Sequence, residues 1–218
     1  MKHVTVLAIA LLCISVYNPL TAQTIRSIYT NPNFDQIASD HRTVAIIPFK
    51  AVIKLRPKDM ADMAAEDLAR MEQQEGESVQ SALYGYFLKR QGKDDYRVAF
   101  QDISKTNALL AKNGITHDVL SEYTMSELAG MLGVDAVISG RLESNKPISE
   151  GAAVALSLLV GVYGPTNSGK VSIFINDGTD DELLWKYEKA LSRSLGSDTN
   201  TIVNALMRKA SRQFPYAQ

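Results

Sequence analysis

Apolar runs along the chain predict three strands. Residues 43–49 read Thr-Val-Ala-Ile-Ile-Pro-Phe, a run rich in β-branched residues and free of charge. Such a run predicts a strand buried on both faces, as in a parallel sheet, and its proline ends the strand because it cannot donate to the ladder. Residues 96–100 and 134–142 predict a second and a third strand.

Apolar residues recur at helical spacing in the segments between and after these strands. This spacing predicts a long helix from about residue 57 to residue 90, a short one at 106–112, and another that begins with the capping-box sequence of Thr124 to Glu127 and ends at Gly133. A last helix is expected after residue 198. Its apolar stripe is formed by Ile202, Val203, Leu206, Met207 and Ala210.

Alternating residues predict a β-hairpin before that last helix. Residues 171–176 and 183–188 alternate on either side of an Asn-Asp-Gly turn, and Trp185 is expected in the core. The elements therefore run strand-helix-strand-helix-strand-hairpin-helix. This order predicts an α/β fold with a mixed sheet of about five strands flanked by helices, in a single domain over residues 43–218.

The segments before this domain differ in character. Residues 1–22 have the pattern of a signal peptide: Lys2, an apolar stretch, and a small residue, Ala22, at the expected cleavage site. The apolar stretch is shorter than the roughly 20 residues of a membrane span, and a retained anchor is the alternative. Residues 23–42 are polar and are expected to form a lead-in arm.

Cysteine usage bears on export and on chemistry. Cys13 lies inside the hydrophobic stretch and follows Leu12, whereas a lipoprotein signal needs a small residue before its cysteine. We therefore expect no lipidation by this route, and a location in the periplasm or at the outer membrane. Cleavage removes the only cysteine, so the exported chain has no disulfide, thiol nucleophile or thiolate metal ligand.

An apolar insertion interrupts the domain at about residues 148–165, and residues 151–161 within it carry no charge. It is too short to span a bilayer, so it is a buried element, a flap that packs on a partner, or a membrane-touching segment. Exposed apolar patches often mark interfaces. The residues predicted to bind a partner are Leu156, Leu158, Leu159, Val160, Val162 and Tyr163.

The sequence predicts no catalytic, cofactor-binding or metal-binding residues. A formal net charge of −1 gives no global attraction to nucleic acid. Residues 164–170 match G-x-x-x-x-G-K, but Val171 stands where a phosphate loop needs Ser or Thr, and a strand follows, so no nucleotide site is expected. His41 and His117 are expected as lone surface histidines. The turn carboxylates are expected to be solvated; they are Asp177, Asp180, Asp181 and Glu182.

Three stretches resemble motifs of a known family. Residues 44–49 resemble its opening "VAVLPF" strand, residues 126–140 its "LG-D-A-hydrophobic-G" helix and strand, and residues 171–185 its hairpin with a D-x-x-T-G turn and a return tryptophan. This family is the periplasmic α/β domain of the curli-secretion lipoprotein (CsgG-like), the penicillin-binding-protein activator lipoproteins and the amino-terminal domain of TolB. The resemblance implies an α/β sandwich, an envelope location and function through protein contacts.

These observations favour a non-catalytic secreted or periplasmic envelope protein that acts by protein–protein binding or assembly. Its expected partners are envelope proteins, with self-association and peripheral membrane contact as further modes, and without nucleic acid or nucleotide. Two alternatives remain open at this stage: a membrane-associated oligomer of the curli-secretion type, and an enzyme with an unrecognised hydrolase-like site.

Overall fold

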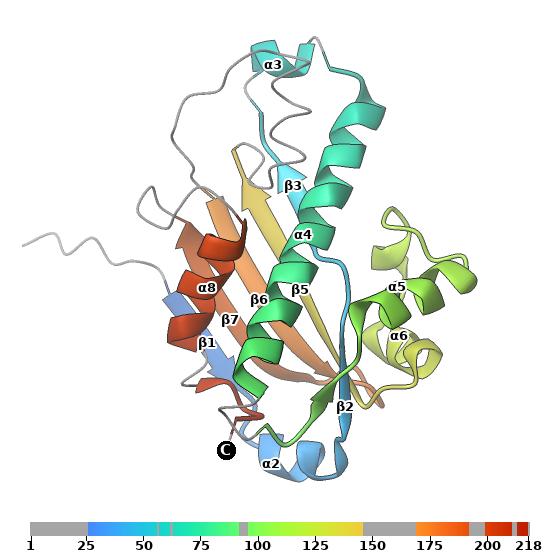
Figure 1. The fold of residues 1–218 in the computed structure, drawn as a ribbon, viewed down its shortest axis with the longest axis vertical. Coiled ribbons are helices and arrows are strands. Elements are labelled where there is room, and N and C mark those ends of the chain that lie inside the picture. Colours follow the sequence, from blue (N-terminus) through green and yellow to red (C-terminus); the bar gives the residue numbers. More distant parts are fainter. Residues whose placement is uncertain are drawn as a thin grey trace, which may run out of the picture.

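A seven-stranded mixed sheet forms the centre of the protein in a computed structural model (Figure 1). The structure describes residues 26–55, 57–61, 63–91, 96–145, 169–191, 199–210 and 213–217. The strand order is β1-β7-β6-β5-β2-β4, and β3 pairs with β5 off this path. The strands are β1 (Arg26–Thr30), β2 (Thr43–Ile46), β3 (Lys50–Ile53), β4 (Ala99–Phe100), β5 (Ala136–Ser144), β6 (Gly169–Asp177) and β7 (Leu183–Leu191).

Helices cover one face of this sheet and part of the other (Figure 1). Successive strand residues point to opposite faces, so β2 separates two cores. Val44 and Ile46 belong to the larger core with α4 and α8, whereas Ala45 and Ile47 belong to a smaller core with α5 and α6. The helices are α2 (Phe34–Ile37), α3 (Pro57–Ala61), α4 (Ala65–Gln91), α5 (Ile103–Lys112), α6 (Met125–Leu132) and α8 (Thr199–Ala210), with 3₁₀ turns η1 (Ala38–Asp40) and η2 (Leu120–Glu122).

The pairing divides the sheet into a parallel and an antiparallel half. Strands β2 and β3 run parallel to the two ends of β5, and β4 runs parallel to β2. From β5 onward through β6 and β7 to β1, every pair is antiparallel. An antiparallel sheet can leave one face to water, and the groove described below lies where this half meets β3.

Phe49, just after β2, explains why two positions inside regular elements are glycines, although glycine is unfavourable in a helix or a strand. A Cβ at Gly140 would lie 2.0 Å from the Phe49 ring, and one at Gly76 would lie 2.0 Å from the Phe49 carbonyl oxygen. The Phe49 amide also donates to the Gly76 carbonyl at 3.2 Å. Gly76 therefore allows the middle of α4 to approach the chain after β2, and the helix continues through it to Gln91.

The predicted fold class is confirmed: the chain forms a mixed α/β sheet flanked by helices, and each of the five predicted strands is present. The capping box of Thr124 and Glu127 is present, and Gly133 ends α6 with a φ of +66°. Two further strands were not predicted. One is β3, and the other is β1, which lies in the stretch expected as a lead-in arm and pairs with β7 from Arg26 to Thr30.

Two predicted segments lie outside the described residues. They are the signal peptide at 1–22 and the apolar insertion at 148–165, which includes all six residues predicted to bind a partner. Both stay predictions. Among the residues that the structure does describe, every helix is too short or too polar to cross a membrane.

Candidate functional site

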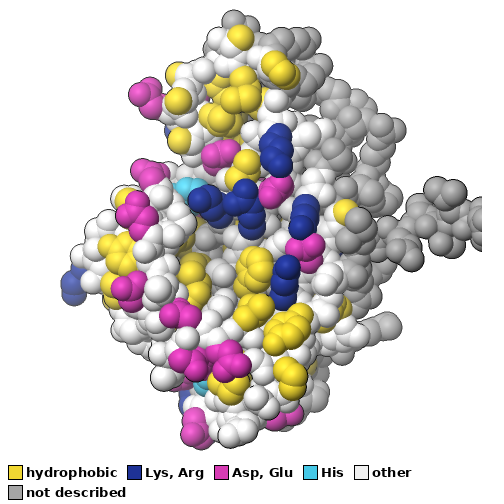
Figure 2. Space-filling view, turned by 180° about the vertical axis from the view of Figure 1, so that it is seen from behind, with side chains coloured by type: hydrophobic (Ala, Val, Ile, Leu, Met, Phe, Trp, Pro, Cys, Tyr) yellow, Lys and Arg dark blue, Asp and Glu magenta, His cyan; other side chains and the backbone are white. Residues whose placement is uncertain are grey.

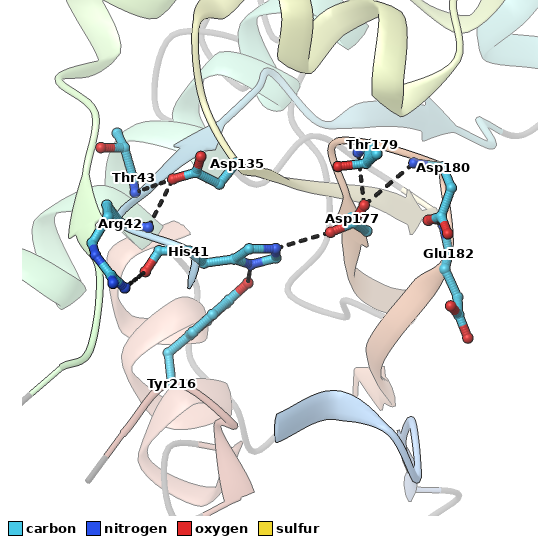
Figure 3. A network of polar contacts seen from close by, with 9 residues as sticks. All are labelled: His41, Arg42, Thr43, Asp135, Asp177, Thr179, Asp180, Glu182 and Tyr216. Atoms are coloured by element: carbon cyan, nitrogen blue, oxygen red, sulfur yellow. Dashed lines mark hydrogen bonds and ion pairs between the residues drawn. The ribbon is translucent and has the colours of Figure 1, made fainter. Parts of the chain in front are cut away.

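The first arrangement of functional side chains is a buried network around His41 (Figure 3). His41 Nε2 lies 2.9 Å from Asp177 Oδ1 at the end of β6, and His41 Nδ1 lies 2.7 Å from the hydroxyl of Tyr216 near the C-terminus. Exposed fractions of 6%, 3% and 0% show that all three side chains are closed off from solvent. The prediction of a surface His41 was wrong, because its partners come from distant parts of the chain.

The ionisation of this network follows from its surroundings. Burial alone raises the pKa of Asp177, but hydrogen bonds from the Thr179 amide, His41 and the Asp180 amide outweigh it, and the pKa lies below its usual value. Burial, with the negative charges of Asp177 and Asp135, raises the pKa of Tyr216. An ionised Asp177 accepts a hydrogen bond from His41 Nε2, and His41 Nδ1 is hydrogen-bonded to the Tyr216 hydroxyl.

The acidic turn between β6 and β7 holds other elements in place. Asp181 accepts hydrogen bonds from the Ser126 amide at 2.6 Å and the Ser126 hydroxyl at 2.8 Å, and so ties the turn to the first turn of α6. Glu182 accepts from Asn31 Nδ2 at 2.7 Å, beyond the end of β1. The prediction of solvated turn carboxylates was therefore wrong for Asp177, which is buried, and for Asp181, which is half-buried against α6, whereas Asp180 and Glu182 are exposed as expected.

These contacts make the buried network structural. An Asp-His pair beside a hydroxyl resembles a catalytic relay, but a substrate must reach the hydroxyl, and Tyr216 is fully buried. None of the three residues lines the grooves that the described residues form beside Pro48 and His117. The described residues also contain no group of three or more His, Cys, Asp or Glu side chains that could hold a metal ion.

The second arrangement is a groove beside the part of the sheet that α5 and α6 leave uncovered. Its volume is about 430 Å³, within the usual range for ligand sites. One wall comes from β3, β5 and β6, and the other from η2, the start of α6 and α4. Its apolar lining includes Ile47, Pro48, Val52, Leu120, Met125 and Phe174.

The polar residues that line this groove are Lys50, Glu72, His117, Asp118, Ser121 and Ser139. Lys50 Nζ lies 3.4 Å from Ser121 Oγ, so the lysine spans the groove from the sheet to η2. His117 Nε2 donates to the Phe49 carbonyl at 3.2 Å, and not to a hydroxyl. Glu72 already accepts the Ile53 amide at 2.9 Å. The groove therefore offers apolar contacts and one spanning cation, and its histidine is not paired with a serine as a serine hydrolase would require.

The open sheet face next to the groove carries charged side chains in rows (Figure 2). We define it by the outward residues of β3, β5, β6 and β7. Register places Lys50, Arg141, Ser172 and Glu188 in one row, and Val52, Glu143, Lys170 and Ala190 in the next; a third row begins Ser139, Phe174, Lys186. This surface could not be predicted from the sequence, because each charge is a single polar position in an alternating strand.

Among known proteins, similarity to this chain is found in solved structures. No protein-family model and no curated protein matches the chain. Similar solved structures include the lipoprotein GNA1162 from Neisseria meningitidis, with a TM-score of 0.44 and 12% identity over 78% of this chain and 94% of that chain. The C-terminal domain of LpoB from Salmonella enterica has a TM-score of 0.39 and 8% identity over 74% and 93%.

A third similar structure is a dodecamer of PelC from Paraburkholderia phytofirmans. Its TM-score is 0.39, with 12% identity over 85% of this chain and 94% of that chain. A bacterial lipoprotein and a dodecameric protein are thus among the structures similar to this chain.

Proposed function

We propose that this chain is an exported, non-catalytic protein of the bacterial envelope that acts by binding other proteins. The observation that carries the proposal is the apolar groove, which opens onto an uncovered sheet face rich in charge. Mixed apolar and charged surfaces of this kind are typical of protein interfaces, whose centre is apolar and whose rim is polar. The signal-peptide pattern of residues 1–22 supports the location.

The hydrolase-like alternative has less support from the geometry. A hydrolytic site needs a nucleophile held by a base within hydrogen-bond reach and open to substrate. In the described part of the chain, the buried His41 reaches no open surface, and His117 is held by a backbone carbonyl. A binding surface accounts for the groove without such groups.

The test is capture of cross-linked partners from the envelope of the native host, followed by mass spectrometry. Affinity-tagged wild type is compared with the tag alone and with Leu156→Asp/Leu159→Asp, a variant of the predicted insertion, after circular dichroism shows that both proteins fold. We expect wild type to enrich one or a few envelope proteins. No enrichment over the tag alone would refute the proposal, and loss in the variant would add the insertion to the interface.

A further inference from the structure

The open sheet face carries more positive than negative charge. Glu143 lies between two cations, with Lys54 Nζ at 2.6 Å and Arg141 Nε at 2.9 Å. Glu188 lies between another two, with Lys170 Nζ at 2.9 Å and Lys186 Nζ at 3.2 Å. With Lys50, five cations share this strip with two carboxylates, so its formal charge is +3, whereas that of the whole chain is −1. We call these five residues the cation strip.

The ion pairs leave the strip with a net positive charge. Hydrogen bonds from Lys54 and Arg141 lower the pKa of Glu143 to about 2, and hydrogen bonds from Lys170 and Lys186 lower that of Glu188. Both carboxylates are thus ionised at neutral pH, and the formal charge of +3 already includes them. The paired cations still face solvent, with side-chain exposures of 67% for Lys54, 48% for Lys170 and 44% for Arg141.

The groove and the cation strip are continuous, because Lys50, Val52 and Phe174 belong both to the groove wall and to the outward rows of the sheet. Lys186 Nζ lies 5.7 Å from the centre of the Phe174 ring, which keeps this cation beside the apolar wall. Carboxylates line only the far wall, at Glu72 and Asp118. A ligand in the groove therefore meets apolar side chains on the sheet wall, and where it extends onto the open sheet face it meets the cation strip.

The geometry points to a partner protein segment in extended conformation that alternates apolar and acidic side chains, with the apolar ones in the groove and the carboxylates on the cation strip. This inference rests on the proposed function and names the chemistry of the partner. The strip crosses four neighbouring strands, a span of about 14 Å at roughly 4.8 Å per strand. Alternate side chains of an extended chain recur every 6.6 Å or so, so about three acidic residues match that span.

A short labelled peptide of alternating leucine and glutamate is the probe, with binding to the purified protein followed by fluorescence anisotropy. The same peptide with lysine in place of glutamate tests the sign of the charge. We expect the glutamate peptide to bind, with an affinity that falls as salt is added, and the lysine peptide to fail. Arg141→Gln/Lys170→Gln should bind the glutamate peptide about tenfold more weakly.

The matched control is Lys105→Gln/Lys112→Gln, which removes two exposed cations from α5 and should bind like wild type. A second variant, Val52→Glu, places a carboxylate in the groove and should also weaken binding. Equal binding by wild type and Arg141→Gln/Lys170→Gln, or equal binding of both peptides, would overturn the inference. So would binding to phosphatidylglycerol vesicles without binding to the peptide, which would assign the strip to a membrane surface.

One comparison separates this inference from the proposed function. If Arg141→Gln/Lys170→Gln captures the same envelope protein as wild type with equal yield, the protein-binding function stands and the placement of the partner on the cation strip is overturned. If neither captures any protein and the peptide does not bind, both fail. Capture by wild type with loss in this variant supports both.

Discussion

At the scale of single residues, Asp177 links the hairpin, the segment before β2 and the C-terminal segment, because its carboxylate holds His41, which in turn contacts Tyr216. Replacing Asp177 with Asn removes the charge that His41 meets inside the protein. We expect Asp177→Asn to lower the free energy of unfolding at pH 7 by about 1–3 kcal/mol, the usual cost of disrupting a buried charged hydrogen bond. Denaturation in urea measures this difference.

The pH dependence of that difference tests its cause. The pKa of Asp177 is lower in the folded than in the unfolded protein, so its contribution to stability is present above the unfolded pKa and is lost as pH falls through the folded value. The gap between wild type and Asp177→Asn should therefore narrow below about pH 4. Asp40→Asn, an exposed carboxylate, is the control and should match wild type throughout. A gap that stays constant into acid would show that the charge of Asp177 is not responsible.

At the scale of elements, α4 offers two glycines in opposite surroundings. A Cβ at Gly76 meets the Phe49 carbonyl oxygen at 2.0 Å, whereas a Cβ at Gly85 has nothing within 4 Å. We expect Gly76→Ala to destabilise the protein by about 1–3 kcal/mol through overpacking against backbone. Gly85→Ala should stabilise it by about 0.5–1 kcal/mol, because alanine favours the helix. Thermal unfolding compares them, and equal shifts would refute the close packing of α4 on Phe49.

Elements with a strong apolar period could be predicted from the sequence, and the others could not. Strands β2, β5, β6 and β7 and the capped helix α6 combine periodicity with clear end signals. Strand β1 lies at the sheet edge, and its residues Ser27, Tyr29 and Thr30 are exposed, so no apolar stripe marks it. Strand β3 has only four residues and follows a proline closely, which favours a loop in any local reading.

At the scale of the whole molecule, the cation strip and the buried network depend on contacts that no local pattern encodes. His41 and Asp177 are 136 positions apart, and neither has a neighbour in sequence that suggests pairing. The cation strip collects single positions from β3, β5, β6 and β7 and the residue after β3. Strand order and register bring them together, and both are set by the global topology, of which only the α/β class could be predicted from local patterns.

The C-terminal segment shows how strongly the global fold depends on a few distant residues. In a purely local view, Phe214 and Pro215 only mark a helix end, because proline cannot continue a helix. In the structure, Phe214 is 3% exposed, with its ring centre 4.9 Å from that of Phe87 and 5.7 Å from that of Trp185, and Tyr216 is fully buried. The Arg97 amide also donates to the Tyr216 carbonyl at 3.0 Å. The segment therefore closes the end of the larger core.

Graded substitutions should reveal this closing role. Phe214→Ala should lower the free energy of unfolding by about 3–5 kcal/mol, the usual cost of emptying a buried phenylalanine site. Tyr216→Phe keeps the ring and removes only the hydroxyl that contacts His41, so a smaller loss of about 1–2 kcal/mol is expected. Urea denaturation ranks the two. If Phe214→Ala unfolds at the same urea concentration as wild type, the C-terminal segment is an appendage and the larger core is complete without it.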